Sequence, residues 1–554
     1  MLTMPSLLQR TARVFGANTA IQDAEGELTW AAYVERIARA AGVLRSLGLK
    51  PFERYAILCR NSVRHAELIH AGYWLGAIPV PLNYRLAPAE IALVLEDAEC
   101  RLLAVEDVFA KLLGHPSLEA WRSRAFAIAA DDAGVALPRY DSMREEARAA
   151  EPYEPAEDDD AILLYTGGTT SRGKGVRITH RNIASNALQL ARAMTVGEHD
   201  VYLHVSPMFH STDLKATALS MMGGAHAYLS DFSPANVLSA VERHRVTIAS
   251  LVPTMIIRVL QEGSLDRYDL GSLRLLSYGT SPMAPEWIRR TIEALPGVDL
   301  HQCYGLTETA PVLAILDEKD HRRALDGREE LLRSVGRPLP GVDVRILDDA
   351  GREVPSGESG EVAVRGPQIA KGYHKRAREN AEVFRGSWFH TGDIGRMDAD
   401  GYLFILDRKK DMVVTGGENV YTSEVEAAIC QHPGVQEAAV IGVPDERYGE
   451  ALFAVIVPAQ GARLSVEEMI AHCRTRIGGY KIPRRMAFVD ALPKTAIGKI
   501  IKQDLRRTYG GAPANHPPIK KTRTEQAHET RIDQRHVTYP AVPSHQGKHH
   551  RIHG

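Results

Sequence analysis

Apolar runs that suit β-strands alternate with amphipathic helical patterns from residue 6 to about residue 406. Strand-like runs lie at 55–58 and 102–105, and a helical pattern lies at 66–76. Strands and helices that alternate in this way bury their apolar faces against each other, as sheets covered by helices. The alternation therefore predicts an α/β fold for most of the chain.

A different pattern follows in the last third of the chain. Short strand-like runs at 342–346 and 361–365 are separated by Gly, Pro and Ser turns, which indicates a β-rich section. A smaller α+β section follows at about 409–509, with strands expected at 438–442 and 451–457. A chain of 554 residues is also too long for one hydrophobic core, so we expect at least two domains.

The composition changes abruptly beyond residue 510. Residues 511–554 contain seven of the 22 histidines and five prolines, together with seven basic and three acidic residues. A segment with so few large apolar side chains cannot bury enough surface to order itself. We expect a solvated tail whose basic groups could give weak association with an acidic membrane surface.

The charge and cysteine content restrict the class of protein. The 67 basic and 69 acidic residues give a formal net charge of −2, so no overall basic field attracts nucleic acid. The five cysteines are scattered without paired spacing, which predicts free thiols in a reducing, cytoplasmic compartment. The N-terminal residues do not resemble a secretory leader, and apolar stretches such as 71–82 are too short for a transmembrane segment.

A glycine-rich loop follows the apolar, strand-like run at 161–164. Residues 165–176 (YTGGTTSRGKGV) place four glycines and the hydroxyl residues 169–171 around Lys174. Glycines let backbone amides turn toward an anion, and the hydroxyls and lysine add donors and positive charge. The loop therefore predicts a phosphate-binding site, with a flexible surface loop as the alternative. A Walker A loop needs Ser or Thr after the lysine, so Gly175 disfavours a P-loop NTPase.

A second segment, at 302–309 (QCYGLTET), forms a pair with this loop. Together they resemble the adenylate-forming superfamily of acyl-CoA synthetases, aryl-CoA ligases, luciferases and peptide-synthetase adenylation domains. The resemblance covers about 6–505, with the motifs in the family's order. The loop departs from the family at Gly167, Ser171 and Gly173, which stand in place of Ser, Gly and Pro. Each exchange keeps the residue small, so we expect a more flexible loop that retains its function.

The resemblance implies the adenylate-forming enzyme fold. In that fold a large N-terminal α/β domain with a β-rich subdomain is joined to a small, mobile α+β C-terminal domain. On this chain the expected parts are a large ATP- and acid-binding domain at 1–406, a hinge at 407–411, a small catalytic domain at 412–510 and a disordered tail at 511–554.

The resemblance also assigns residues to a nucleotide site. Glu308 would hold Mg²⁺, Thr307 would contact the α-phosphate, and Lys499 would bridge the acyl carboxylate and the α-phosphate. Asp393 and Arg408 would contact the ribose, whereas an aspartate that caps a local turn is the alternative for Asp393. The expected phosphate-loop residues are Thr166, Gly168, Thr169, Thr170, Ser171 and Lys174.

The acid and CoA sites are assigned in the same way. His210 ends a family block at 206–210 and would gate the acid pocket, with a structural histidine as the alternative. Domain rotation about Lys410 would bring Gly416 and Gly417 to the pantetheine arm of CoA, since glycines let the backbone approach closely. The other expected cofactor-binding or pocket-wall residues are Gly279, Thr280, Ser281, Tyr304 and Gly305.

Several nearby side chains receive structural interpretations instead. Cys303 is expected to be a buried thiol, and Lys494 and Lys502 are expected to be ordinary surface lysines. No charged residue stands out as a partner for a substrate amino group, which disfavours activation of amino acids. Methionines also gather in and around the pocket segments of the sequence, where such residues are more often part of the core than of a pocket. They are Met208, Met221, Met222, Met255 and Met283.

The motifs together predict an ATP-dependent, AMP-forming carboxylic acid–CoA ligase that uses ATP, Mg²⁺, CoA and a fatty or aromatic acid. Both acid classes are compatible with an apolar pocket. One alternative is an enzyme that loads the pantetheine of a carrier protein. Another is a non-catalytic nucleotide-binding relative, which would be expected to lose Lys499, Glu308 or Asp393, although all three are present. A light-producing oxidase is a chemically close but disfavoured relative.

Overall fold

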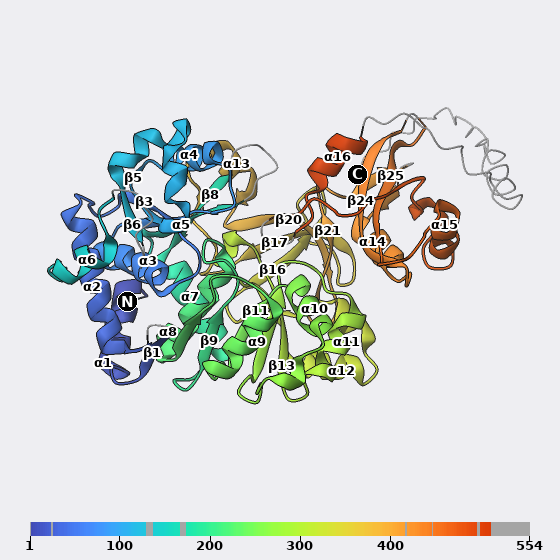
Figure 1. Ribbon diagram of the computed structural model, residues 1–554. Helices are drawn as coiled ribbons and strands as arrows, with labels where there is room; N and C mark the ends of the chain where they lie inside the picture. Colours follow the sequence, from blue (N-terminus) through green and yellow to red (C-terminus); the bar gives the residue numbers. More distant parts are fainter. Residues whose placement is uncertain are drawn as a thin grey trace, which may run out of the picture.

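The computed structural model describes residues 2–23, 26–128, 137–166, 173–415, 418–445, 447–495 and 499–510. Figure 1 shows a large body, coloured blue to yellow, and a smaller orange-to-red domain joined to one side of it. The large body contains two mainly parallel sheets and a β-rich section, and the small domain has a sheet of its own. The predicted α/β class, with a large N-terminal and a small C-terminal domain, is confirmed.

The largest sheet has nine strands in the order β15-β14-β13-β12-β11-β9-β10-β1-β2. Neighbouring strands from β13 to β1 pair in parallel, whereas the strands beyond them at both edges pair antiparallel. The strands are β1 (Thr19–Asp23), β2 (Gly26–Thr29), β9 (Val201–His204), β10 (Ala225–Tyr228), β11 (Ile248–Leu251), β12 (Leu275–Gly279), β13 (Asp299–Tyr304), β14 (Ala314–Leu316) and β15 (Arg337–Pro338). The accompanying helices are α8 (Thr217–Met222), α9 (Pro234–Arg243), α10 (Pro253–Glu262), α11 (Pro285–Ala294) and α12 (Glu318–Leu325).

A second, fully parallel sheet has the order β4-β3-β5-β6, and a three-stranded antiparallel sheet has the order β18-β8-β7. The strands predicted at 55–58, 102–105 and 161–164 lie within these elements, and the helix predicted at 66–76 ends one residue earlier than predicted, at Leu75. The strands are β3 (Arg54–Leu58), β4 (Ile78–Pro81), β5 (Cys100–Glu106), β6 (Ala125–Ile128), β7 (Asp160–Thr166), β8 (Lys174–Thr179) and β18 (Gly372–Tyr373). The helices are α1 (Met4–Val14), α2 (Trp30–Ser46), α3 (Val63–Leu75), α4 (Pro88–Asp97), α5 (Asp107–Ala110), α6 (Tyr140–Glu146) and α7 (His180–Ala193).

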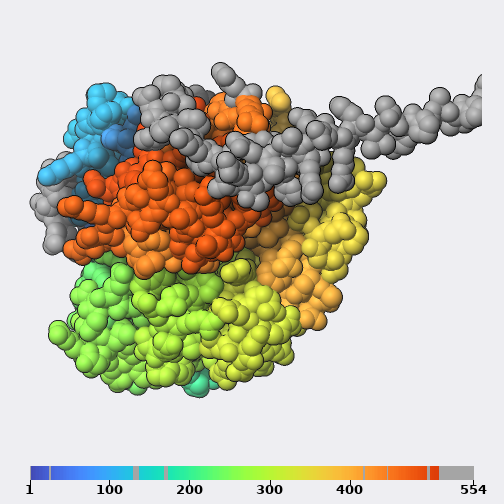
Figure 2. Space-filling model, turned by 90° about the vertical axis from the view of Figure 1, so that its right-hand side faces the viewer, coloured from blue at the N-terminus to red at the C-terminus, as the bar shows by residue number. Residues whose placement is uncertain are grey.

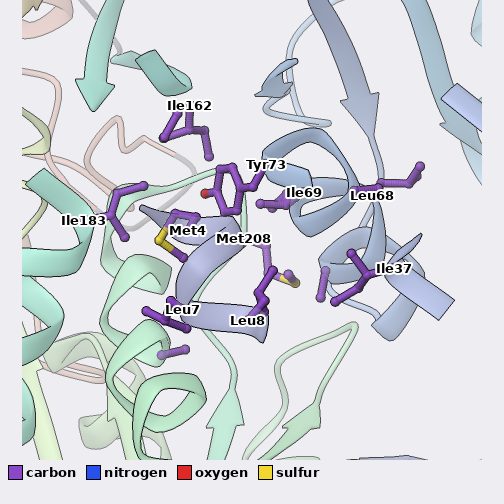
Figure 3. Close-up of a cluster of buried hydrophobic side chains, with 14 of the residues drawn as sticks. Met4, Leu7, Leu8, Ile37, Leu68, Ile69, Tyr73, Ile162, Ile183 and Met208 are labelled. Atoms are coloured by element: carbon purple, nitrogen blue, oxygen red, sulfur yellow. The ribbon is translucent and has the colours of Figure 1, made fainter. Parts of the chain in front are cut away.

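A shared apolar core joins these layers of the large domain. Figure 3 shows part of it, where Met4, Leu7 and Leu8 of α1 lie near side chains of α2, α3 and α7. Leu8 and Ile37 are completely buried in this cluster. Because burying one such side chain contributes about 1.5–3 kcal/mol, the cluster holds the two parallel sheets in a fixed relation. The ends of their strands therefore form a rigid base for a site.

The β-rich section and the small domain complete the fold. The section has the order β16-β17-β20-β19, with β21 paired to β20, and the small domain has β23-β22-β25-β24, with β26 paired to β25. The elements of the section are β16 (Asp343–Leu347), β17 (Ser359–Arg365), α13 (Ala377–Val383), β19 (Phe384–Arg385), β20 (Trp388–Met397) and β21 (Leu403–Arg408). Those of the small domain are β22 (Val413–Thr415), β23 (Glu418–Val420), α14 (Thr422–Cys430), β24 (Val435–Asp445), β25 (Gly449–Pro458), α15 (Val466–Arg474), β26 (Arg485–Phe488) and α16 (Lys502–Tyr509).

Short 3₁₀ helices connect several of these elements. They are η1 (Lys111–Gly114), η2 (Pro116–Arg124), η3 (Ser211–Ala216), η4 (Leu265–Arg267), η5 (Thr307–Thr309), η6 (Glu329–Arg333) and η7 (Gly479–Lys481). Two of them lie at segments predicted to line the site: η3 directly follows the segment at 206–210, and η5 forms the end of the segment at 302–309. In the described part of the chain, none of the helices combines the length and the apolar character that a bilayer crossing requires.

Candidate active site

The carboxyl ends of β12 and β13 lie side by side. β12 leads into the predicted residues Thr280 and Ser281, and β13 leads into the rest of the segment predicted at 302–309. Gly279 stands opposite Cys303 in the parallel register. A Cβ atom added at Gly279 would lie 2.1 Å from the Cys303 carbonyl oxygen, so only glycine permits this close approach. The next residue, Thr280, has a φ of 69°. A β-branched residue rarely adopts this left-handed conformation, and such strain gathers at functional sites.

Three of the residues predicted to bind the nucleotide form one hydrogen-bonded group. The Tyr304 hydroxyl donates to Asp393 Oδ2 (2.6 Å), and Arg408 Nε donates to Asp393 Oδ1 (2.7 Å). Asp393 is only 2% exposed. Burial raises the pKa of its carboxyl group, and the Arg408 guanidinium opposes that rise. The structure thus brings together residues from β13, β20 and β21.

A second group forms around Glu308 at the start of η5. Glu308 is buried, and its Oε1 accepts a hydrogen bond from the Tyr373 hydroxyl (2.6 Å). The Lys174 ammonium lies 5.0 Å from the centre of the Tyr373 ring. Tyr373 therefore connects the predicted metal ligand with the predicted phosphate-loop lysine. The sequence analysis missed this tyrosine because no motif marks it.

The ends of the glycine-rich loop are anchored by a β-hairpin. Thr166 on β7 pairs with Lys174 on β8, and its hydroxyl donates to the Lys174 carbonyl oxygen (3.4 Å). Residues 167–172, between these anchors, lie outside the described part of the chain, as do two glycines of the small domain. The predicted site residues that lie outside the described part are Gly168, Thr169, Thr170, Ser171, Gly416 and Gly417.

Lys499 of the small domain lies close to the residues of the large domain. Burial lowers the pKa of Lys499 to about 8, and Arg408 lowers it further while Asp393 opposes the change. Burial also lowers the pKa of His210 to about 4, with Lys215 and then Lys499 contributing. Lys499 is therefore within electrostatic range of Asp393, Arg408 and His210. Figure 2 views the side of the molecule on which the orange-to-red small domain lies above the green part of the large domain.

The remaining predicted residues, His210, Gly305 and Thr307, lie at or just before the starts of η3 and η5. The Thr307 and Ser211 hydroxyls are 3.1 Å apart, so η5 and η3 begin next to each other. The Thr212 amide donates to His210 Nδ1 (3.3 Å), which orients the imidazole. A Cβ atom added at Gly305 would lie 2.0 Å from the Pro311 carbonyl oxygen, so this glycine permits the turn from β13 into η5.

A small cavity adjoins His210 on the side of α3. Its volume is about 40 Å³, and its lining includes Tyr73, His204 and Tyr228. This volume suits ordered water rather than the chain of an organic acid. The cavity is therefore distinct from the pocket expected at the ends of β12 and β13.

One of these structural expectations is wrong. Lys502 is not an ordinary surface lysine, because its Nζ lies 2.7 Å from Glu426 Oε1 and its side chain is 15% exposed. The pairing has a physical reason, since desolvation raises the pKa of the partly buried Glu426 carboxyl group and the Lys502 ammonium opposes that rise. Lys494 also forms an ion pair, with Glu437 (2.5 Å), but it is more exposed. Cys303 is buried, as predicted.

The methionines do not form one cluster around the pocket. Met208 and Met221 belong to the core that joins α1, α2, α3 and α7. Met283 belongs to a different core, against the largest sheet, and Met255 packs on it from one side. The two faces of the sheet separate these side chains, which sequence proximity to the motifs did not reveal.

Comparisons with known proteins agree with this arrangement. The family model described as AMP-binding enzyme matches residues 8–374, and the model of the AMP-binding enzyme C-terminal domain matches residues 424–499. A feruloyl-CoA synthase from Amycolatopsis sp is 38% identical, over 90% of this chain and 98% of the relative. A long-chain-fatty-acid–CoA ligase from Mycobacterium tuberculosis is 35% identical, over 85% of this chain and 91% of the relative.

A solved structure shows the same fold. It is an o-succinylbenzoate CoA synthetase from Bacillus subtilis in complex with its acyl-adenylate intermediate. The match has a TM-score of 0.79 at 29% identity, and it covers 90% of this chain and 97% of that chain.

Proposed function

Because the chain belongs to the AMP-binding enzyme family, we propose that it is an ATP-dependent, AMP-forming carboxylic acid–CoA ligase. Its adenylate-forming enzyme fold is the one that the motifs predicted. One observation carries the proposal: Tyr304 and Arg408 hold the buried Asp393 carboxylate at 2.6 and 2.7 Å. Lys499 of the small domain is within electrostatic range of this group. Cations from both domains, Lys499 and Arg408, suit a reaction in which two anionic substrates must meet.

In the first half-reaction a carboxylate oxygen of the acid attacks the α-phosphorus of ATP. A carboxylic–phosphoric anhydride, the acyl-adenylate, forms as the bond to pyrophosphate breaks. Both reactants are anionic, so preorganised cations must offset their repulsion and the charge that develops at phosphorus. Lys499 and Arg408 would act near the α-phosphate and ribose, and Lys174 would act at the departing phosphates.

In the second half-reaction the thiol of CoA attacks the acyl carbon, and AMP leaves with the former carboxylate oxygen. The products are a thioester and AMP. His210 has a pKa of about 4, so its imidazole is neutral near pH 7. A neutral, hydrogen-bonded ring can close one wall of the acid pocket without adding charge. We therefore assign it a gating role rather than acid–base catalysis.

We propose Glu308 as the protein ligand of Mg²⁺. Among the described residues, no three His, Cys, Asp or Glu side chains form a metal cluster. Mg²⁺ commonly takes one or two protein carboxylates together with substrate phosphates, so a single buried carboxylate near the loop lysine fits. When bound, the ion would neutralise phosphate charge. Tyr373 would orient the carboxylate through Oε1.

Replacing Glu308 with Gln should lower turnover by at least about tenfold and shift the Mg²⁺ dependence to higher concentration, because an amide is a weaker ligand than a carboxylate. Pyrophosphate release across a Mg²⁺ titration measures both effects. Glu379→Gln removes a neighbouring acidic group near Tyr373 and serves as the matched control. If the Glu308 variant gave an unchanged Mg²⁺ titration, another residue would hold the metal.

The lowered pKa of Lys499 predicts how adenylation depends on pH. The protonated form is the active one, so kcat/KM for pyrophosphate release should be retained below pH 8 and should fall as pH rises through about 8. Lys499→Arg keeps a positive charge throughout this range, so its lower activity should not show the fall. A flat wild-type profile between about pH 7 and pH 9.5 would contradict the role of this ammonium.

The substrate acid is proposed to be fatty or aromatic, in line with the names of the two relatives compared above. The five free cysteines, four of them buried, support a reducing cytoplasmic setting. AMP release with ATP and CoA should be screened over fatty, benzoic and cinnamic acids. Acid-dependent AMP release that also requires CoA supports the proposal. Release that requires a pantetheinylated carrier protein instead would favour the carrier-loading alternative.

A further inference from the structure

Lys215 on η3 is a buried cation that the sequence analysis did not single out. The residue is 5% exposed. The ammonium donates to Ser250 Oγ (2.5 Å) and to Ser277 Oγ (3.2 Å). Within the described residues these two hydroxyls are its hydrogen-bond partners, and no carboxylate lies at ion-pair distance. A buried ammonium that is bonded to hydroxyls alone is costly, so its presence calls for an explanation.

The two serines connect Lys215 to β11 and β12, and β12 ends at the segment expected to line the acid pocket. Ser250 on β11 stands opposite Ser277 on β12. Side chains two residues apart in a strand lie on the same face, so Ser277 shares a face with Gly279 at the end of β12. Cys303 stands opposite Gly279. Burial lowers the pKa of Lys215, and Cys303 and then Asp213 oppose that change. Lys215 is thus bonded to the two strands and lies within electrostatic range of the residue opposite Gly279.

Lys215 is also connected to the reacting end of the site. The helix η3 starts at Ser211, whose hydroxyl lies 3.1 Å from that of Thr307. Lys215 follows four residues later, a little more than one turn of a 3₁₀ helix. Both Lys215 and Lys499 are close enough to His210 to affect its imidazole. The neutral ring therefore lies within reach of two lysines that come from different domains.

We propose that Lys215, with Ser250 and Ser277, forms a subsite for a second acidic oxygen group at the far end of the acid substrate. The inference rests on the proposed function and specifies its substrate class. A carboxylate or an acidic phenol would give the ammonium a charge-assisted hydrogen bond, which is shorter and stronger than a bond to a neutral hydroxyl. An acid without such a group would leave the buried ammonium with its two hydroxyl partners alone.

The test compares three acids of similar shape: cinnamic, 4-hydroxycinnamic and 4-carboxycinnamic acid. For each acid, kcat/KM for AMP release is measured with wild type, with Lys215→Met and with Lys371→Met, an exposed-lysine control on the large domain. Wild type should prefer at least one acid that bears the second group. Lys215→Met should lower kcat/KM for that acid by about tenfold to a hundredfold. The same variant should change kcat/KM for cinnamic acid by no more than about threefold, since loss of a polar contact affects mainly the substrate that uses it.

The two arms identify the group: a loss confined to the 4-carboxy acid assigns a carboxylate, and a loss confined to the 4-hydroxy acid assigns a phenol. Equal kcat/KM ratios in wild type and Lys215→Met would overturn the subsite, as would an equal loss on all three acids at an unchanged melting temperature. Ser277→Ala, which keeps the lysine, should shift the same ratio by a smaller factor and covers the case in which Lys215→Met does not fold. Absence of acid-dependent AMP release in wild type over fatty, benzoic and cinnamic acids would instead remove the proposed function itself.

Discussion

Replacing Lys499 with Ala should lower the rate of acyl-adenylate formation by about 10²–10³-fold, the cost of removing one preorganised group that stabilises developing charge. Thioester formation from a supplied acyl-adenylate should stay close to the wild-type rate. The reason is positional. The Lys499 ammonium is within electrostatic range of Asp393, Arg408 and His210, where the α-phosphate would bind. In the proposed domain rotation, the second step would use a different part of the small domain. Pyrophosphate exchange measures the first half-reaction, and thioester formation from acyl-adenylate and CoA measures the second.

The matched control is Lys494→Ala, five residues earlier in the same segment. Lys494 forms an ion pair with Glu437 on its own domain. Because such a partly exposed pair contributes about 0–1 kcal/mol, both half-reactions should change little. Equal losses in both half-reactions of Lys499→Ala would contradict the assignment of this lysine to adenylation alone.

Replacing Lys410 with Pro should have the opposite effect, with adenylation retained and thioester formation slowed on the order of a hundredfold, because proline locks φ at a position proposed to rotate. Lys410 lies in the turn between β21 and β22, where the Asp411 and Met412 amides donate to the Arg408 carbonyl oxygen (2.9 and 3.0 Å). Within the described residues the Lys410 amide donates no hydrogen bond, so proline removes none. The same two half-reaction assays measure the outcome.

Lys410→Ala is the control, since it removes the side chain and leaves the backbone free to rotate. Both of its half-reactions should stay near wild type. Lys409→Pro would not serve, because the Lys409 amide donates to the Gly392 carbonyl oxygen (2.9 Å) and its loss would disturb the observed conformation. A Lys410→Pro enzyme that forms the CoA thioester at the normal rate would rule out a hinge at this residue.

The features that the sequence predicted correctly are those with a local signal. The strand at 161–164 and the helix at 66–76 follow from apolar runs and periodicity; the strand lies within β7, and the helix ends one residue earlier than predicted, at Leu75. Asp393 and Arg408 belong to family motifs, and Arg408 Nε lies 2.7 Å from Asp393 Oδ1. Here the local pattern and the packing agree, because the two motifs lie on the paired strands β20 and β21.

The missed residues depend on contacts between distant parts of the chain. Tyr373 reaches Glu308 only because the two-residue strand β18 pairs with β8, which lies far away in sequence. Lys502 is partly buried and forms an ion pair with Glu426, which lies far from it in the sequence. Lys215 resembles any lysine on a polar helix until Ser250 and Ser277 are seen to surround its ammonium. Neither periodicity nor composition reports such pairings.

The central claim is that the acid passes through an acyl-adenylate, and an oxygen-isotope experiment tests it most directly. The acid is labelled with ¹⁸O in its carboxylate and is converted with ATP and CoA, and the nucleotide products are analysed by mass spectrometry. Attack of the carboxylate on the α-phosphorus, followed by attack of the thiol on the acyl carbon, leaves one carboxylate oxygen on AMP. The account predicts AMP that carries one ¹⁸O per thioester formed. Unlabelled AMP, or ADP together with labelled inorganic phosphate, would contradict it.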